Sequence, residues 1–173
     1  MRKIITFLAV VGMFSLQSCT VNDATDYVDH DTIPEAFEIK NVNLGRVADN
    51  EYNLKSTFQF EVGGNLFDDE TVLVYRLTDI VNSNTPVWQL IPRTIYFNNG
   101  DVIDYYFDFS KVDFIITARG SFNLLNAPTF INNQTFRVVI MPSVLAKSVN
   151  KNDFSEVMSA LNLKENQVQQ IKF

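Results

Sequence analysis

Cysteine and histidine are almost absent from this 173-residue chain, which contains one of each, Cys19 and His30. Catalysis by a Ser/His/Asp or Cys/His arrangement needs an imidazole held beside the nucleophile. A zinc site usually needs several Cys or His ligands. One cysteine also excludes a disulfide within the chain. These shortages argue against the common nucleophilic hydrolases, dithiol redox proteins and zinc proteins.

Glycine and proline are also scarce, with six glycines and five prolines. No glycines are spaced as in the G-x-G-x-x-G turn that binds dinucleotides, and no P-loop motif is present. Most glycines and prolines beyond residue 40 stand between apolar runs, which is typical of turns. Phosphate-cradling loops of these two kinds are therefore excluded.

Basic residues are outnumbered, with 14 Lys and Arg against 20 Asp and Glu. Two of the basic residues, Arg2 and Lys3, lie in a segment that we expect to be removed, which leaves a net charge near −8. Nucleic acids and anionic lipid surfaces both attract clustered Lys and Arg. The composition therefore indicates no nucleic-acid partner and no electrostatic adhesion to anionic lipid.

The N-terminus has the pattern of a secretory signal peptide. Arg2 and Lys3 precede a mainly apolar run over residues 4–16. That run is too short to remain as a membrane-spanning helix. We expect residues 1–18 to be a signal peptide.

The end of this segment, Leu16-Gln17-Ser18-Cys19, resembles a bacterial lipoprotein signal of the Bacteroidota type, although Gln17 departs from the usual small residue. The alternative is an ordinary signal peptide followed by an unrelated cysteine. The resemblance implies acylation of Cys19, with fatty acids such as palmitate, and anchoring to a lipid bilayer. Each buried acyl CH₂ contributes about 0.8 kcal/mol, so two or three chains would anchor stably. Thr20 carries no inner-membrane retention signal by the same analogy, which favours the outer membrane, at its periplasmic face or the cell surface.

An acidic, polar stretch over residues 19–35 predicts a flexible tether. His30 lies within it and is expected to be solvated. Asp31-Thr32-Ile33 resembles the Bacteroidota O-glycosylation pattern, which would place a glycan on Thr32.

Residues 36–173 are predicted to form one domain built mainly of β-strands. The chain has 15 Phe, and Val, Ile and Tyr are frequent, as is typical of strands. Strands are expected at residues 36–47, 52–62, 71–78, 87–91, 94–97, 102–109, 111–117 and 135–141, with a loop at 79–86 and a turn at Arg119-Gly120. This pattern favours an antiparallel β-sandwich, with an immunoglobulin-like arrangement as one form and a small β-barrel as the alternative.

Near the C-terminus the apolar period becomes helical. Asp153 begins a capping-box pattern with Glu156, so one short helix is expected. Its stripe is expected to pack on the sheets rather than to receive a partner; the stripe consists of Phe154, Val157, Met158 and Leu161. Residues 164–173 fit either a helical turn or a closing strand.

The register of one hairpin follows from side-chain alternation. The apolar residues on both sides of Asn98-Asn99-Gly100 are odd-numbered, and directly paired residues face the same side of a sheet. A three-residue loop pairs Ile95 with Ile103 and puts Gly100 at the left-handed position.

Four segments resemble a group of small Bacteroidota envelope lipoproteins. They cover residues 71–77, 87–92, 104–109 and 136–142. The shared residues are core and turn residues, so the resemblance implies a fold and a location and no activity.

Carboxylates are the remaining candidates for chemistry. Asp104 and Asp108 alternate with an apolar set and should face water, where solubility explains them. Residues 68–70 are acidic but lack the alternating ligands of a known calcium loop. Trp88 fits a core position better than a sugar-stacking surface.

The sequence therefore favours a non-catalytic, lipid-anchored envelope protein that binds a glycan, a peptide or another envelope protein, or has a structural role, without a cofactor. The alternative is a carboxylate-dependent hydrolase acting on envelope glycans. Exposed aromatic contacts are expected at Tyr96 and Tyr106, and the connection 121–134 is the other place where a site is expected.

Overall fold

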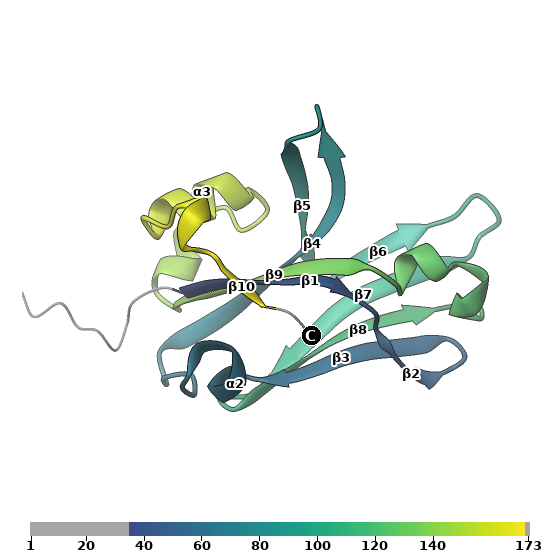
Figure 1. Cartoon of the computed structure of the whole chain (residues 1–173), viewed down its shortest axis with the longest axis horizontal. Coiled ribbons are helices and arrows are strands. Elements are labelled where there is room, and N and C mark those ends of the chain that lie inside the picture. Colours follow the sequence, from purple (N-terminus) through teal and green to yellow (C-terminus); the bar gives the residue numbers. More distant parts are fainter. Residues whose placement is uncertain (1–34, 172–173) are drawn as a thin grey trace, which may run out of the picture.

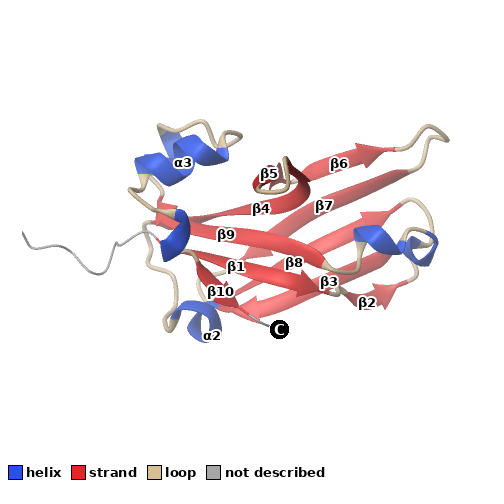
Figure 2. Ribbon diagram, turned by 45° about the horizontal axis from the view of Figure 1, so that its top comes forward, coloured by secondary structure: helices blue, strands red, loops and turns tan. Residues whose placement is uncertain are grey.

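The computed structural model describes residues 35–171, which form a β-sandwich (Figures 1 and 2). The first sheet has the order β10-β1-β9-β4-β5, and the second has the order β2-β3-β8-β7-β6. The strands of the first sheet are β1 (Glu35–Val42), β4 (Glu70–Val81), β5 (Thr85–Ile91), β9 (Gln134–Pro142) and β10 (Gln169–Ile171). Those of the second are β2 (Gly45–Ala48), β3 (Glu51–Thr57), β6 (Arg93–Tyr96), β7 (Val102–Phe109) and β8 (Asp113–Gly120).

The predicted antiparallel β-sandwich is thereby confirmed, and the sheets do not close into the alternative barrel. The strand order differs from the ABED and CFG sheets of an immunoglobulin domain. All pairings are antiparallel except the one between β1 and β10. That pair resolves the ambiguous C-terminus as a closing strand, preceded by the 3-10 turn η5 (Glu165–Gln167).

The core lies between the two sheets, because alternate residues of each strand point inward. Phe37 of β1 faces Phe114 of β8, with ring centroids 5.9 Å apart. Other fully buried side chains between the sheets are Ile39, Val74, Ile103, Ile116, Phe136 and Val138.

The first sheet is buried on its outer face as well. Helix α3 (Phe154–Ala160) and the 3-10 turn η4 (Leu145–Lys147) cover it. The buried stripe of α3, with Val157 and Met158, packs against strand residues such as Tyr75 and Val139. Packing of the helix on the sheet is therefore confirmed.

Only one half of the capping box predicted for α3 is formed, the half made by Asp153. The Asp153 carboxylate accepts hydrogen bonds from the backbone N–H groups of Ser155 and Glu156 at 3.0 and 3.1 Å. The Glu156 carboxylate accepts from the backbone N–H of Asn150 at 3.0 Å instead of reaching back to Asp153. The cap therefore also fixes the loop before the helix.

The predicted hairpin register is confirmed. Ile95 pairs with Ile103, and the Phe97 N–H donates to the Asp101 carbonyl at 2.9 Å. Gly100 has φ of 88°, in the left-handed region that favours glycine.

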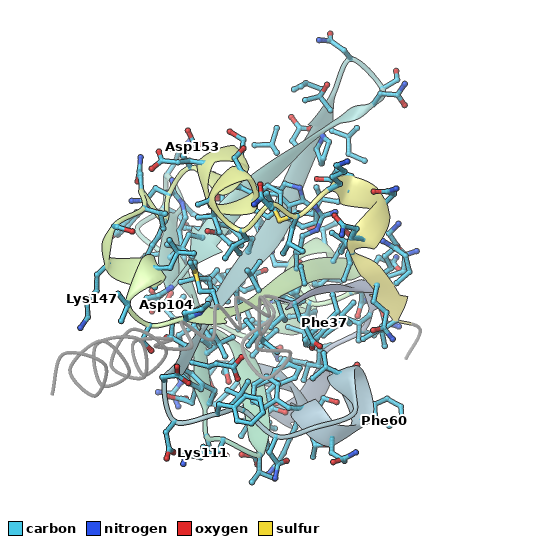
Figure 3. All side chains as sticks on the ribbon, turned by 90° about the vertical axis from the view of Figure 1, so that its left-hand side faces the viewer. Phe37, Phe60, Asp104, Lys111, Lys147 and Asp153 are labelled. Carbon is cyan, nitrogen blue, oxygen red and sulfur yellow. The ribbon has the colours of Figure 1, made fainter. Side chains whose placement is uncertain are left out.

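The strand predicted over residues 52–62 is wrong in its second half. β3 ends at Thr57, and residues 58–62 form helix α2 (Phe58–Val62). The Thr57 hydroxyl caps the helix by accepting from the Phe60 N–H at 3.3 Å, and Gly63 ends it with φ of 81°. Phe60 consequently points away from the body of the protein and is 71% exposed (Figure 3).

Other predicted boundaries also change. The segment 36–47 divides into β1 and β2, which belong to different sheets. Residues 79–86 belong mostly to the β4–β5 hairpin, which projects from the sandwich (Figure 1), and only Asn82 to Asn84 form the turn. Val112 lies in the turn before β8, where its N–H donates to the Ser110 hydroxyl at 3.1 Å, and it is 50% exposed.

The expected turn at Arg119-Gly120 is instead the end of strand β8. Gly120 is needed there for space, since a Cβ at this position would lie 2.6 Å from a methyl carbon of Leu124. Close approach of the connection 121–134 therefore explains this glycine.

Replacing Gly100 with alanine should lower the free energy of unfolding by about 1–2 kcal/mol, because an L-residue in the left-handed region is strained. Gly64 is the matched control, since it has no positive φ and open space around its Cα. Gly64→Ala should leave the stability unchanged or raise it slightly. Urea denaturation measures both; equal losses would contradict the hairpin geometry.

Candidate functional site

An open pocket of about 590 Å³ lies between the β4–β5 hairpin, strand β6 and the connection after β8. We call it the edge pocket, because β5 and β6 are the edge strands of their sheets on this side. Its volume is in the range of small-ligand sites. It is lined by Arg76, Thr78, Gln89, Arg93, Thr94, Ile95, Tyr96, Thr129 and Phe130.

Arg76 is the buried charge of the edge pocket. It is on the inward-facing parity of β4, with Val72 and Val74, and only 9% of its surface is exposed. Its guanidinium lies 4.4 Å from the ring centroid of Tyr105 and 5.9 Å from that of Phe130. Burial lowers the pKa of Arg76, and no carboxylate contributes to that pKa.

Gln134 fixes the orientation of this guanidinium. The Arg76 Nε donates to the Gln134 side-chain oxygen at 2.8 Å. The Gln134 amide nitrogen in turn donates to the carbonyls of Thr129 and Asn132 at 2.8 and 2.7 Å. Arg76 is therefore held by an amide whose nitrogen is itself fixed by two backbone carbonyls.

The 3-10 turn η3 (Pro128–Phe130) closes one end of the edge pocket. The Tyr105 hydroxyl donates to the Phe130 carbonyl at 2.5 Å, and burial raises the pKa of Tyr105 to about 12. Phe97 packs edge-on against Phe130, with centroids 5.5 Å apart. These contacts hold the turn in place beside Arg76.

The remaining lining combines a second cation, hydroxyl groups and an exposed ring. Within residues 35–171, neither Arg93 nor Arg76 forms an ion pair, and no Asp or Glu lines the edge pocket. Tyr96 lies at the rim of the edge pocket and is 79% exposed. In a chain with more acidic than basic residues, this is a local concentration of positive charge.

Tyr106, the other aromatic residue predicted to be exposed, is half-buried. It lines a neighbouring pocket of about 380 Å³ together with Asp104 and Arg119, and this pocket also borders Arg93 and Thr94. Asp104 accepts a hydrogen bond from the Thr94 hydroxyl at 2.5 Å. Asp108 is exposed further along β7 and lines neither pocket.

Two other carboxylates, Glu38 and Glu61, are buried, and neither lines either pocket. Glu38 forms an ion pair with Arg137, and hydrogen bonds and charges of Arg137 and Lys40 lower its pKa against the effect of burial. Burial raises the pKa of Glu61, whose second oxygen has no hydrogen-bond partner. Glu35 is exposed, and partial desolvation of its carboxylate together with the nearby Glu70 raises its pKa.

The acidic segment 68–70 has structural contacts of its own. Asp68 forms an ion pair with Lys111, and Glu70 accepts from the Phe67 N–H at 2.8 Å. Within the described residues, no group of three or more His, Cys, Asp or Glu side chains is arranged to hold a metal ion.

Trp88 packs under helix α3 on the outer face of the first sheet, as the sequence favoured. Its ring lies 4.3 Å from the Arg137 guanidinium and 5.6 Å from the Phe154 ring. This packing leaves the Trp88 Nε1–H buried without a partner.

The structure brings together Tyr96 and the connection 121–134, both expected at a site, and places Tyr106 at the adjacent pocket. Sequence analysis missed Arg76 and Gln134. One signal was present: Arg76 interrupts the inward parity of an otherwise apolar strand. Cys19 and Thr32, the expected sites of acylation and glycosylation, lie outside the described residues.

No protein-family model, curated protein or solved structure matches this chain. In the described part, no helix has the length and apolar character needed to cross a bilayer.

Replacing Glu61 with glutamine should stabilise the protein at pH 8 and not at pH 4. The pKa of Glu61 is raised in the folded state, so its contribution to stability is present below the unfolded pKa of about 4.3 and is lost as pH rises through the folded pKa. Urea denaturation at both pH values measures the difference. Asp108→Asn, at an exposed carboxylate, is the control; a gain for Glu61→Gln that is the same at both pH values would contradict this account.

Proposed function

We propose that this protein is a non-catalytic binding module, held at the outer membrane by lipid on Cys19, with its ligand in the edge pocket. The observation that supports it most is Arg76, a buried guanidinium fixed by Gln134 and facing an open pocket without a carboxylate partner. Burying a charge without an ionic partner lowers stability. An anionic group of a ligand would supply the ionic partner that Arg76 lacks in the described chain.

The lining favours binding over catalysis. General acid–base catalysis needs a group that exchanges a proton near neutral pH, most often His, Asp or Glu. The edge pocket is lined by arginines, threonines, a glutamine and aromatic or apolar side chains. Tyr96 is the one side chain among them of a type that can act as a general acid or base, and it is 79% exposed. The other side chains of the lining can position a ligand.

One surface is compatible with attachment to a bilayer. Exposed Phe60, Phe67 and Val112 lie around helix α2. Phe67 donates its N–H to Glu70, which lies close to Glu35, where the described chain begins. A lipid-anchored N-terminus would therefore enter the domain beside an apolar surface.

Anchoring is tested by metabolic labelling with an alkyne fatty acid. The wild-type chain should be labelled and sediment with membranes, and Cys19→Ala should lose the label. An unlabelled wild-type chain would exclude the lipoprotein assignment. Ser18→Ala, a small-residue change next to the cysteine, is a control that should keep the label.

Binding is tested with the full chain on glycan and envelope-peptide arrays, with products monitored for turnover. We expect binding without cleavage. Gln89→Trp should fill the edge pocket and reduce binding at least tenfold, whereas Gln59→Trp on α2 should not. Unchanged binding by Gln89→Trp would contradict the site. Hydrolysis that disappears with Asp104→Asn or Asp108→Asn would contradict the non-catalytic function.

A further inference from the structure

We infer that the ligand of the edge pocket is an acidic glycan, bound through a sugar carboxylate at Arg76 and Arg93. This inference rests on the proposed binding function and adds the chemical class of the ligand. It follows from which hydrogen-bonding groups of the pocket are already used and which are left for a ligand.

The two arginines supply donors and no acceptors. Arg76 uses its Nε on Gln134, and its guanidinium also interacts with Tyr105, but no carboxylate of the described residues pairs with it. Arg93 is exposed and makes no ion pair within residues 35–171. A planar carboxylate matches the fork of a guanidinium and would relieve the unpaired buried charge.

Two threonines of the edge pocket offer acceptors to a ligand, whereas the arginines offer donors. The Thr78 hydroxyl donates to the Val87 carbonyl at 3.1 Å, and the Thr94 hydroxyl donates to Asp104 at 2.5 Å. Their hydrogens are therefore used, and only their oxygen lone pairs remain for a ligand. The ligand must then bring donors of its own, and the hydroxyl groups of a sugar are suitable donors.

The exposed Tyr96 ring favours a ligand with a flat, partly apolar face. A tyrosine that is 79% exposed at the rim of a pocket gains when its ring is covered. The C–H face of a pyranose ring can cover it. An isolated phosphate could satisfy the arginines and would leave the ring and the threonine oxygens without partners.

The charges around the edge pocket favour acidic glycans over neutral ones. Asp104 lines the adjacent pocket and not the edge pocket, and its carboxylate accepts a hydrogen bond from Thr94. Its cross-strand neighbour is Arg119. Neutral glycans would leave the Arg76 guanidinium unpaired, so they should bind more weakly than acidic glycans of the same length.

Isothermal titration calorimetry on the full chain in detergent tests this selectivity. The probes are trimers of galacturonic acid, the galactose trimer of the same linkage, glucuronic acid, N-acetylneuraminic acid and inorganic phosphate. At least one acidic sugar should bind ten times more tightly than the galactose trimer and than phosphate. Arg93→Gln, at an exposed position, should weaken that binding at least tenfold, and Tyr96→Ala should weaken it severalfold.

Arg46→Gln is the matched control, because Arg46 is an exposed arginine on β2, at the opposite edge of the same sheet. It should change the affinity by less than twofold. Arg76→Lys keeps the charge without the fork and should also weaken binding. Equal binding of the galactose trimer or of phosphate, or no binding of any acidic sugar, would overturn the acidic-glycan assignment. Failure of the proposed binding function is distinguished by the arrays, where no ligand of any class would bind.

Discussion

The arrangement depends on β9, a strand buried on both faces. It pairs with β1 on one side and β4 on the other, and all residues of β9 except Pro142 are buried. Each large apolar side chain that is fully buried contributes about 1.5–3 kcal/mol. β9 begins at Gln134, so the hydrogen-bonded ladder that secures the core also fixes the residue that orients Arg76. The Arg76 side of the edge pocket is thus held by a residue of the central, buried strand β9.

Two arginines on neighbouring strands show the difference between a structural charge and a charge left for a ligand. Arg137 of β9 lies on the outer face, where Glu38 and Glu165 both pair with it and the Trp88 ring covers it. Arg76 of β4 lies opposite Phe136, on the inner face, with aromatic rings around it and no carboxylate partner in the described chain. The fold neutralises the first internally and leaves the second facing an open pocket.

The sequence predicts those features that side-chain alternation alone determines. The register at Ile95 and Ile103 is correct because a shift of one residue would expose the whole apolar set. The prediction fails at α2, since Phe58 and Phe60 have the spacing of a strand while the Thr57 cap and Gly63 favour a helical turn. Tyr96 could be predicted at the site because it stands on a polar parity. The pairing of Arg76 with Gln134 joins residues 58 positions apart, which no local pattern indicates.

The central claim is that a ligand carboxylate binds the Arg76 guanidinium, and side-chain NMR tests it at that atom. The Arg76 Nε–H is hydrogen-bonded to Gln134, so its resonance should be observable in the free protein. Titration with the tightest-binding acidic sugar should shift the Nε–H resonances of Arg76 and Arg93. Those of Arg46 and of Arg119, which is paired with Glu51, should stay in place. An unchanged Arg76 resonance at saturation would contradict the account.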